Sequence, residues 1–143
     1  MRRQGAVHSL ALDADLSTIL IVDDDPSTRF VLRLILEREG YDVVEAGNGA
    51  AALDLIRPDP LPDMVMTDLM MPVMTGVELI RRLRSEPRTA TMRIVVVSSN
   101  PEAAESLEVD AVVTKPFTAS KLADRIRAVA NNPIGGRPME GRA

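Results

Sequence analysis

The 143-residue sequence contains no cysteine, one histidine and only two lysines. The absence of cysteine excludes disulfide bonds, thiolate catalysis and cysteine-ligated metals. The single histidine, His8, lies in a stretch interrupted by polar residues, so the sequence does not favour histidine-based acid–base chemistry. No apolar run approaches the length that a membrane span requires. Because lysine is so scarce, the positions of Lys115 and Lys121 are informative.

The charge balance and composition are those of an ordinary globular domain. With 17 basic and 21 acidic residues the net charge is −4, so the sequence shows no electrostatic footprint for nucleic acid. Apolar residues make up 45% of the chain and charged residues 27%, which suits one compact domain. We therefore expect a cytoplasmic protein without nucleic-acid or membrane partners.

Five short apolar stretches have the pattern of strands that are buried on both faces. They lie at residues 18–22, 41–46, 64–68, 94–97 and 111–114. A helical pattern follows each of them, which predicts an α/β fold with a parallel sheet covered by helices on both sides. Only 11 residues separate Ser98 from Asp110, and this spacing limits the fourth helix to about two turns. One domain is expected at residues 17–131, between a flexible leader at 1–16 and a flexible tail at 132–143.

The first helix has clear start and stop signals. Asp25 is expected to cap it, Pro26 to occupy its first position and Gly40 to end it. Apolar residues recur at helical spacing and are expected to form its inner face. These residues are Phe30, Val31, Leu34 and Ile35.

Polar side chains follow four of the predicted strands. Asp23 and Asp24 end the first strand, Asp68 the third, Ser98 the fourth and Lys115 the fifth. In open parallel sheets, sites form beyond the carboxyl ends of the strands, where the strand order reverses. If the order is 2-1-3-4-5, three aspartates meet there and repel one another by several kcal/mol at intermediate dielectric. A magnesium ion would relieve this repulsion, because it prefers oxygen ligands.

Simpler roles remain open for each of these residues. The aspartates at 23–25 could merely cap the first helix, although one aspartate suffices for that. Asp68 could be a turn or capping residue, and Ser98 could bond to local backbone. Lys115 could be a solvated charge at the end of a strand. Their occurrence at the same edge of one sheet favours a shared site, in which a hydroxyl and an ammonium group suit the oxygens of a phosphoryl group on Asp68.

Four motifs in the same order resemble the receiver domain of two-component response regulators. They are I-L-I-V-D-D-D, M-T-D-L-M-M-P, V-V-V-S-S and T-K-P-F-T, and the resemblance extends from about Thr18 to Ala130. It implies a doubly wound, flavodoxin-like sheet in the order 2-1-3-4-5. It also implies that Asp68 accepts a phosphoryl group from a phosphohistidine of a sensor histidine kinase or a phosphotransfer protein. The protein would then be a single-domain signalling protein rather than an enzyme, acting on a downstream protein target as a monomer or weak homodimer.

The same resemblance assigns the remaining site residues. Asp24 and Asp68 would bind Mg2+ directly, Asp23 would bind it through water, and the backbone carbonyl of Met70 would be a further ligand. Ser98 and Lys115 would contact the phosphoryl oxygens. The peptide bond between Lys115 and Pro116 would be cis, which is plausible before proline.

Three features depart from the family pattern. Val112 occupies the position, three residues before the lysine, where the family usually has an aromatic residue that reports phosphorylation. The fourth helix, around which family members often meet their targets, is shortened. Met70, two residues after the acceptor, is apolar and poorly suited to orient an attacking water, so we expect a comparatively long-lived phosphoryl group.

Three rival functions follow from other interpretations. Residues 47–52 (G-N-G-A-A-A) resemble a dinucleotide-binding turn, but Glu45 precedes the glycines and no substrate domain is visible. A magnesium-dependent aspartyl-phosphatase would use Asp23 as nucleophile and Asp25 as acid, but it needs a late acidic pair where this chain has Lys115. A receiver-like binding module could also regulate a partner without phosphorylation.

Overall fold

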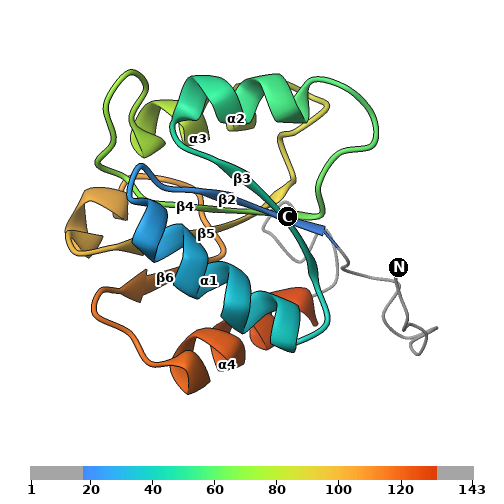
Figure 1. Cartoon of the computed structure of the whole chain (residues 1–143). Helices are drawn as coiled ribbons and strands as arrows, with labels where there is room; N and C mark the ends of the chain where they lie inside the picture. Colours follow the sequence, from blue (N-terminus) through green and yellow to red (C-terminus); the bar gives the residue numbers. More distant parts are fainter. Residues whose placement is uncertain (1–17, 132–143) are drawn as a thin grey trace.

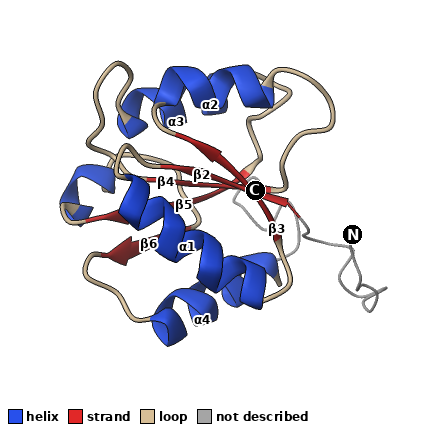
Figure 2. Ribbon diagram, viewed as in Figure 1, coloured by secondary structure: helices blue, strands red, loops and turns tan. Residues whose placement is uncertain are grey.

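The computed structural model describes residues 18–131, so the predicted leader and tail lie outside the described residues (Figures 1 and 2). Within this range the sheet strands are β2 Thr18–Val22, β3 Asp42–Ala46, β4 Met64–Thr67, β5 Arg93–Ser98 and β6 Ala111–Thr114. All pairings are parallel, and the strand order is β3-β2-β4-β5-β6. Counted along the chain, this is the predicted order 2-1-3-4-5, and the expected α/β architecture is confirmed.

The helices cover both faces of the sheet. They are α1 Pro26–Arg38, α2 Gly49–Ile56, α3 Gly76–Ser85 and α4 Ala119–Ala130, together with the 3-10 helix η2 Pro101–Ala104. In Figure 1, α2 and α3 lie on one side of the sheet and α1 and α4 on the other. None of the helices in this range is long and apolar enough to cross a membrane.

The fourth crossover contains a shortened helix, as the spacing predicts. The predicted helix of up to two turns is a single 3-10 helix of four residues, η2. The side chain of Asn100 makes no capping hydrogen bond to it, although Pro101 does occupy its first position. The short spacing explains why the helix is reduced, because the same 11 residues must also return the chain to the start of β6.

Alternating strand residues build two hydrophobic layers. One layer joins the sheet to α2 and α3, and its core includes Leu20, Val22, Val65, Ile94, Val96, Ile56, Leu79, Ile80 and Leu83. The other joins it to α1 and α4, and its core includes Ile19, Ile21, Met66, Val95, Val97, Leu32, Leu36, Leu122, Ile126 and Val129. Because both faces are covered, the polar residues that end the strands are confined to the carboxyl edge of the sheet.

The boundaries of α1 agree with the prediction, but its predicted inner face is wrong. Asp25 accepts the N–H of Ser27, and Gly40 ends the helix region with a φ of 100°. The residues that α1 buries are Leu32 and Leu36. Apolar residues occur on more than one side of this helix, so their spacing alone did not identify the buried side.

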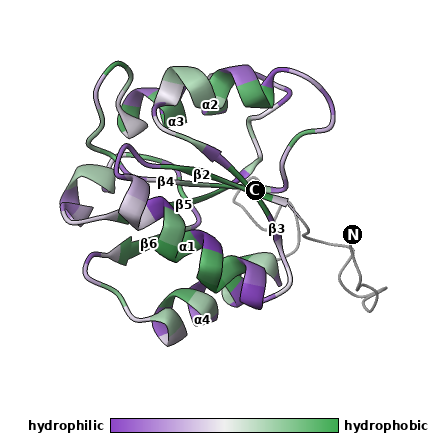
Figure 3. Ribbon diagram, in the orientation of Figure 1, coloured by the Kyte–Doolittle hydropathy of each residue, from purple (hydrophilic) through white to green (hydrophobic). Residues whose placement is uncertain are grey.

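Three apolar side chains of α1 are exposed as a consequence. Phe30 is 60% exposed, Val31 45% and Leu34 47%, whereas Ile35 packs partly against the core. Figure 3 shows hydrophobic residues on the side of α1 that faces the viewer. We call Phe30, Val31 and Leu34 the α1 apolar face.

The loop between β4 and α3 contains a residue in a costly backbone conformation. Val73 has a φ of 72° and is 81% exposed. The left-handed region costs an L-residue about 1–2 kcal/mol, and asparagine tolerates it better than a β-branched residue. We expect Val73→Asn to raise the free energy of unfolding by about 1 kcal/mol in urea denaturation. Val73→Ala, which keeps a Cβ in the left-handed region but loses the β-branch, should gain less; an equal gain would assign the effect to the lost exposed apolar group.

Candidate functional site

The two central strands bring the predicted acidic residues together. β2 and β4 are neighbours, with Val22 opposite Thr67, so Asp23 and Asp68 emerge side by side. The N–H of Asp68 donates to the carbonyl of Val22 at 3.0 Å. One carboxylate oxygen from each of Asp23, Asp24 and Asp68 lies within 4.8 Å of the others. We call these three residues the acidic triad.

Lys115 reaches the acidic triad from the end of β6. Its Nζ donates to Oδ2 of Asp23 at 3.0 Å and to Oδ2 of Asp68 at 3.0 Å. Burial alone would lower the pKa of Lys115, but the hydrogen bonds to Asp68 and Asp23 outweigh it and leave the pKa raised. Lys115 is therefore a stable cation between two carboxylates, and its peptide bond to Pro116 is cis, as the resemblance implies.

Asp23 is the buried member of the triad. Its exposed fraction is 1%, and burial raises its pKa, although the Asp25 N–H and the Lys115 ammonium group oppose the rise. The Asp25 N–H donates to Oδ1 of Asp23 at 2.9 Å. Asp25 itself has a lowered pKa because the Thr28 hydroxyl and the Ser27 N–H donate to it. Asp25 thus serves the helix cap, and Asp23 faces the site.

The carboxylate of Asp68 is held by groups on both of its oxygens. The N–H of Leu69 donates to Oδ1 at 2.6 Å, that of Met70 lies 3.4 Å from the same atom, and Lys115 binds Oδ2. Behind it, the backbone approaches the start of α3 very closely. A Cβ on Gly76 would lie 1.9 Å from the carbonyl oxygen of Asp68, so only glycine fits there.

Ser98 lies at the same edge of the sheet but does not contact Asp68 through a hydrogen bond in the described structure. It is fully buried, and its hydroxyl accepts the N–H of Asn100 at 3.0 Å. Its carbonyl accepts the N–H of Lys115 at 3.0 Å, which places it beside the lysine. The roles assigned to Ser98 and to the Met70 carbonyl stay predictions.

Sequence reasoning missed a pair of residues that supports Asp23. Arg29 of α1 donates through NH1 to the Asp23 carbonyl at 2.5 Å and through Nε to Oε1 of Glu45 at 2.9 Å. Arg33 donates to the other oxygen of Glu45 at 2.6 Å. The i, i+4 spacing of the two arginines indicated a shared helix face, but no sequence signal pointed to Glu45 on β3 as their partner.

The Glu45 ion pairs predict a defined acid dependence of stability. The hydrogen bond from Arg33 lowers the pKa of Glu45, burial opposes this, and Arg29 lowers it further. A lowered folded-state pKa contributes stability that is present above the ordinary value of 4.5 and is lost as the pH falls through the folded value. We expect wild type to exceed Glu45→Gln by about 1 kcal/mol in urea denaturation at neutral pH. The advantage should shrink at acid pH, and one that persisted there would contradict this assignment.

The acidic triad fits a magnesium ion. Three carboxylate oxygens within 4.8 Å supply the hard oxygen ligands that Mg2+ prefers, and one of them comes from the buried Asp23. Each pair of charges at this separation repels by about 3 kcal/mol at an effective dielectric constant near 20. Lys115 offsets part of that repulsion in the structure, and a divalent cation would offset more.

The space beside the turn that resembles a dinucleotide-binding motif is filled by a side chain of the protein. Gly49 donates its N–H to the Met74 carbonyl at 3.3 Å, and a Cβ on Gly49 would lie 2.8 Å from Cγ of Met74. Asn48 caps α2 by accepting the N–H of Ala51. The glycine therefore allows close packing, and Met74 occupies the space next to it.

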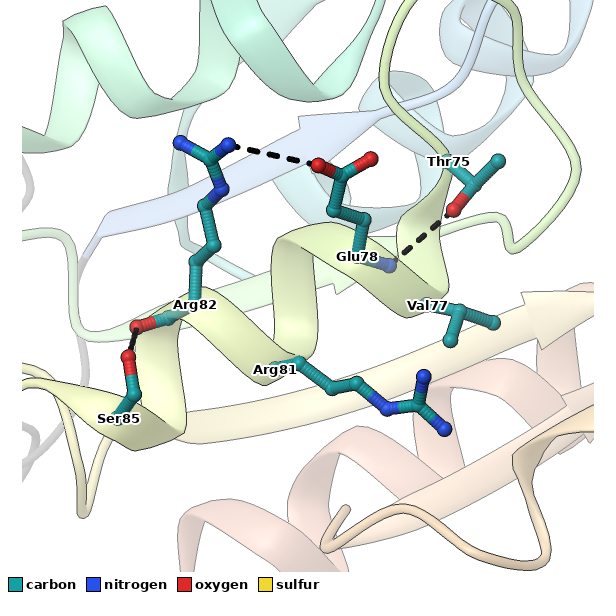
Figure 4. Close-up of a pocket in the computed structure, with 6 residues that line it drawn as sticks. All are labelled: Thr75, Val77, Glu78, Arg81, Arg82 and Ser85. Carbon is teal, nitrogen blue, oxygen red and sulfur yellow. Dashed lines mark hydrogen bonds and ion pairs between the residues drawn. The ribbon is translucent and has the colours of Figure 1, made fainter.

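A separate surface hollow lies along α3 (Figure 4). Its volume is about 440 Å³, and the residues that line it are Thr75, Val77, Glu78, Arg81, Arg82 and Ser85. Within it, Arg82 pairs with Glu78, and Thr75 caps the helix by accepting the Glu78 N–H. None of these residues belongs to the acidic triad, so we do not assign the hollow to the site.

Comparisons with known proteins agree with this geometry. The family model described as "Response regulator receiver domain" matches residues 19–127. The DNA-binding response regulator MtrA of Mycolicibacterium smegmatis is 35% identical over 119 residues, which cover 82% of this chain and 52% of that protein. The chain thus spans about half the length of the first curated relatives that it matches.

Solved structures show the same likeness. A putative response regulator from Chloroflexus aurantiacus is 32% identical, with a TM-score of 0.76 over 80% of this chain and 98% of that one. The response regulator TrrA of Thermotoga maritima, solved in complex with Mg(2+)-BeF, is 27% identical, with a TM-score of 0.69 over 80% of this chain and 99% of that one. With a family match over more than half of its length and the fold of these structures, the chain belongs to the response regulator receiver domain family.

Proposed function

We propose that this receiver domain accepts a phosphoryl group on Asp68 and signals through contacts with other proteins. The observation that carries the proposal is the position of Asp68 in the acidic triad, with Nζ of Lys115 3.0 Å from its Oδ2. An exposed route to the site exists, because Asp24 is exposed and Asp68 is partly so. The domain would act by changing its own state rather than by turnover of a substrate.

The transfer needs little from the protein beyond positioning and charge. A carboxylate oxygen of Asp68 forms a bond to the phosphorus of a phosphohistidine, and the P–N bond of the donor breaks with its electron pair returning to the imidazole. The Lys115 ammonium group donates to an oxygen of the transferred phosphoryl group and neutralises part of its charge. Ser98, whose hydroxyl lies at the same edge and accepts the Asn100 N–H, donates its own proton to another of these oxygens.

The acidic triad would hold the magnesium ion that this chemistry uses. Asp24 and Asp68 are the direct ligands in our proposal, Asp23 acts through water, and the Met70 carbonyl completes the protein's share. When bound, the ion neutralises charge on the phosphoryl oxygens and on the crowded carboxylates. The structure of TrrA in complex with Mg(2+)-BeF supports this assignment by similarity.

The α1 apolar face suits a docking site for the phosphodonor. It begins five residues after Asp25, on the helix whose N-terminus adjoins the acidic triad. Three exposed apolar side chains at 30, 31 and 34 present a stripe that fits the apolar face of a partner helix. We propose that a sensor histidine kinase or a phosphotransfer protein contacts the domain here.

Phe30→Asp tests this docking site. It should lower the rate of phosphotransfer from a protein donor at least tenfold, because a desolvated aromatic contact is replaced by a charge. The rate with acetyl phosphate, which needs no docking surface, should stay unchanged. Arg38→Asp, a charge change at the far end of the same helix, is the matched control. An equal loss with both donors would indicate damage to the site rather than to docking.

One experiment tests the proposed function as a whole. Acetyl phosphate with magnesium should label wild type but not Asp68→Ala, and removal of magnesium with a chelator should abolish labelling. No labelling of either protein would favour a binding module that acts without phosphorylation. This is the second candidate function, and it is favoured by Val112 in place of the usual aromatic residue and by the short η2. The single-domain organisation and the cytoplasmic location stay predictions.

A further inference from the structure

Among the methionines in the described part of this chain, one side chain is exposed to solvent. The sequence has no cysteine and eight methionines, six of which lie within residues 18–131. Five of the six are nearly or fully buried: Met64, Met66, Met71, Met74 and Met92 are at most 9% exposed. Met70 is 60% exposed. An oxidant in solution would therefore meet the Met70 thioether before any other sulfur of the described residues.

The exposed thioether lies close in sequence to Asp68, the proposed phosphoacceptor. Met70 lies two residues after Asp68, and its N–H is 3.4 Å from Oδ1 of Asp68. A thioether is a weak hydrogen-bond acceptor, so Met70 in its reduced form offers little to a water that approaches this carboxylate. A sulfoxide would place a polar oxygen on the same side chain.

We propose that Met70 is an oxidation site, at which a peroxide forms methionine sulfoxide and thereby shortens the lifetime of a phosphoryl group on Asp68. The lifetime part of this proposal rests on the proposed function of Asp68. The oxidation part rests only on the exposure of the side chains.

The chemistry balances with hydrogen peroxide as the oxidant. The Met70 sulfur attacks one peroxide oxygen, an S–O bond forms and the O–O bond breaks. The leaving hydroxide takes the proton from the oxygen that is now bound to sulfur and departs as water. The sulfur thus loses two electrons and the peroxide gains them. The sulfoxide oxygen then accepts a hydrogen bond from a water near Asp68 and orients it toward the phosphorus.

Peptide mapping by mass spectrometry tests the first part on the full chain. With graded hydrogen peroxide, sulfoxide should form at Met70 about tenfold faster than at the five buried methionines, because susceptibility follows exposure. Peptides that contain Met1 and Met139, which lie outside the described residues, are followed separately. Oxidation of Met70 at the same rate as Met64 or Met66 would overturn the proposal.

Decay of the labelled phosphoaspartate tests the second part. After peroxide is removed, label from acetyl phosphate should decay about threefold to tenfold faster than in untreated protein, as expected for a weakly placed proton acceptor. Methionine sulfoxide reductase should restore the slower decay. Met70→Gln, which carries a permanent carbonyl acceptor, should decay faster than Met70→Leu without any peroxide.

The matched variant is Met70→Leu, compared only with its own untreated sample. Its decay rate should not respond to peroxide, because it lacks the sulfur. An equal response of Met70→Leu would assign the effect to another methionine and overturn the proposal, as would unchanged decay in wild type with Met70 oxidised. If neither treated nor untreated wild type takes label, the function proposed for Asp68 fails together with the lifetime claim, whereas the mapping result still decides the oxidation site.

Discussion

Replacing Gly76 by alanine is expected to destabilise the domain by about 3 kcal/mol and to displace the phosphoacceptor. The new Cβ would lie 1.9 Å from the carbonyl oxygen of Asp68, 2.8 Å from Cα of Leu69 and 2.9 Å from the carbonyl carbon of Asp68. All three are backbone atoms, so no side-chain rotation relieves the contact. The strand end that carries Asp68 must move away from α3, and the acidic triad moves with it.

Urea denaturation measures the loss of stability, and labelling by acetyl phosphate measures the effect on the site. Gly47→Ala is the matched control, because its Cβ would meet only NH1 of Arg29 at 3.6 Å, an ordinary contact. It should cost less than about 1 kcal/mol and leave labelling intact. Similar losses in both variants would show that the close approach of α3 to Asp68 does not matter.

Replacing Asp24 by asparagine is expected to weaken magnesium binding about a hundredfold, because loss of an indirect partner of a metal ligand already costs 10–100-fold. The variant keeps the size of the side chain but removes one of three charges whose oxygens lie within 4.8 Å. Titration calorimetry with magnesium gives the dissociation constant directly. Without magnesium, stability should not fall, since the repulsion within the triad is reduced.

Asp25→Asn is the control for this experiment. Asp25 is the next residue along the chain, but its carboxylate caps α1 through Ser27 and Thr28 and lies outside the acidic triad. Asparagine caps helices about as well as aspartate, so the variant should fold normally and bind magnesium as wild type does. Equal weakening by both substitutions would mean that magnesium responds to the total negative charge of residues 23–25 and not to the triad.

Much of the arrangement could be predicted because strand ends are informative in a doubly wound sheet. The runs that end at Asp23, Asp68, Ser98 and Lys115 are short, β-rich and buried, so their boundaries were clear and their carboxyl ends had to share one edge. The strand order came from the family resemblance. No periodicity in a single sequence determines which strands are neighbours.

The features that the sequence did not predict depend on tertiary contacts. The buried side of α1 is set by Leu32 and Leu36, because they meet the sheet, whereas Phe30 and Leu34 have the same spacing and are exposed. The Arg29–Glu45 pair joins residues 16 positions apart on different elements. The need for glycine at 76 follows only from the path of the Asp68 backbone.

The surface that usually reads the state of a receiver is altered in two places. η2 has four residues where an α-helix was expected, and Val112 on β6 is partly buried against the core of the α2 and α3 layer. Val112 has no ring to rotate between buried and exposed positions. The elements that contact the Asp68 carboxylate directly are Lys115 and the β4–α3 loop.

Our proposal that Asp68 itself carries the phosphoryl group is tested by locating the acyl phosphate in the labelled protein. Protein labelled by acetyl phosphate with magnesium is reduced with borohydride, which converts a phosphorylated aspartate to homoserine, and its peptides are sequenced by mass spectrometry. We predict a single homoserine at position 68. Modification at Asp23 instead would contradict the account and favour the chemistry of an aspartyl-phosphatase.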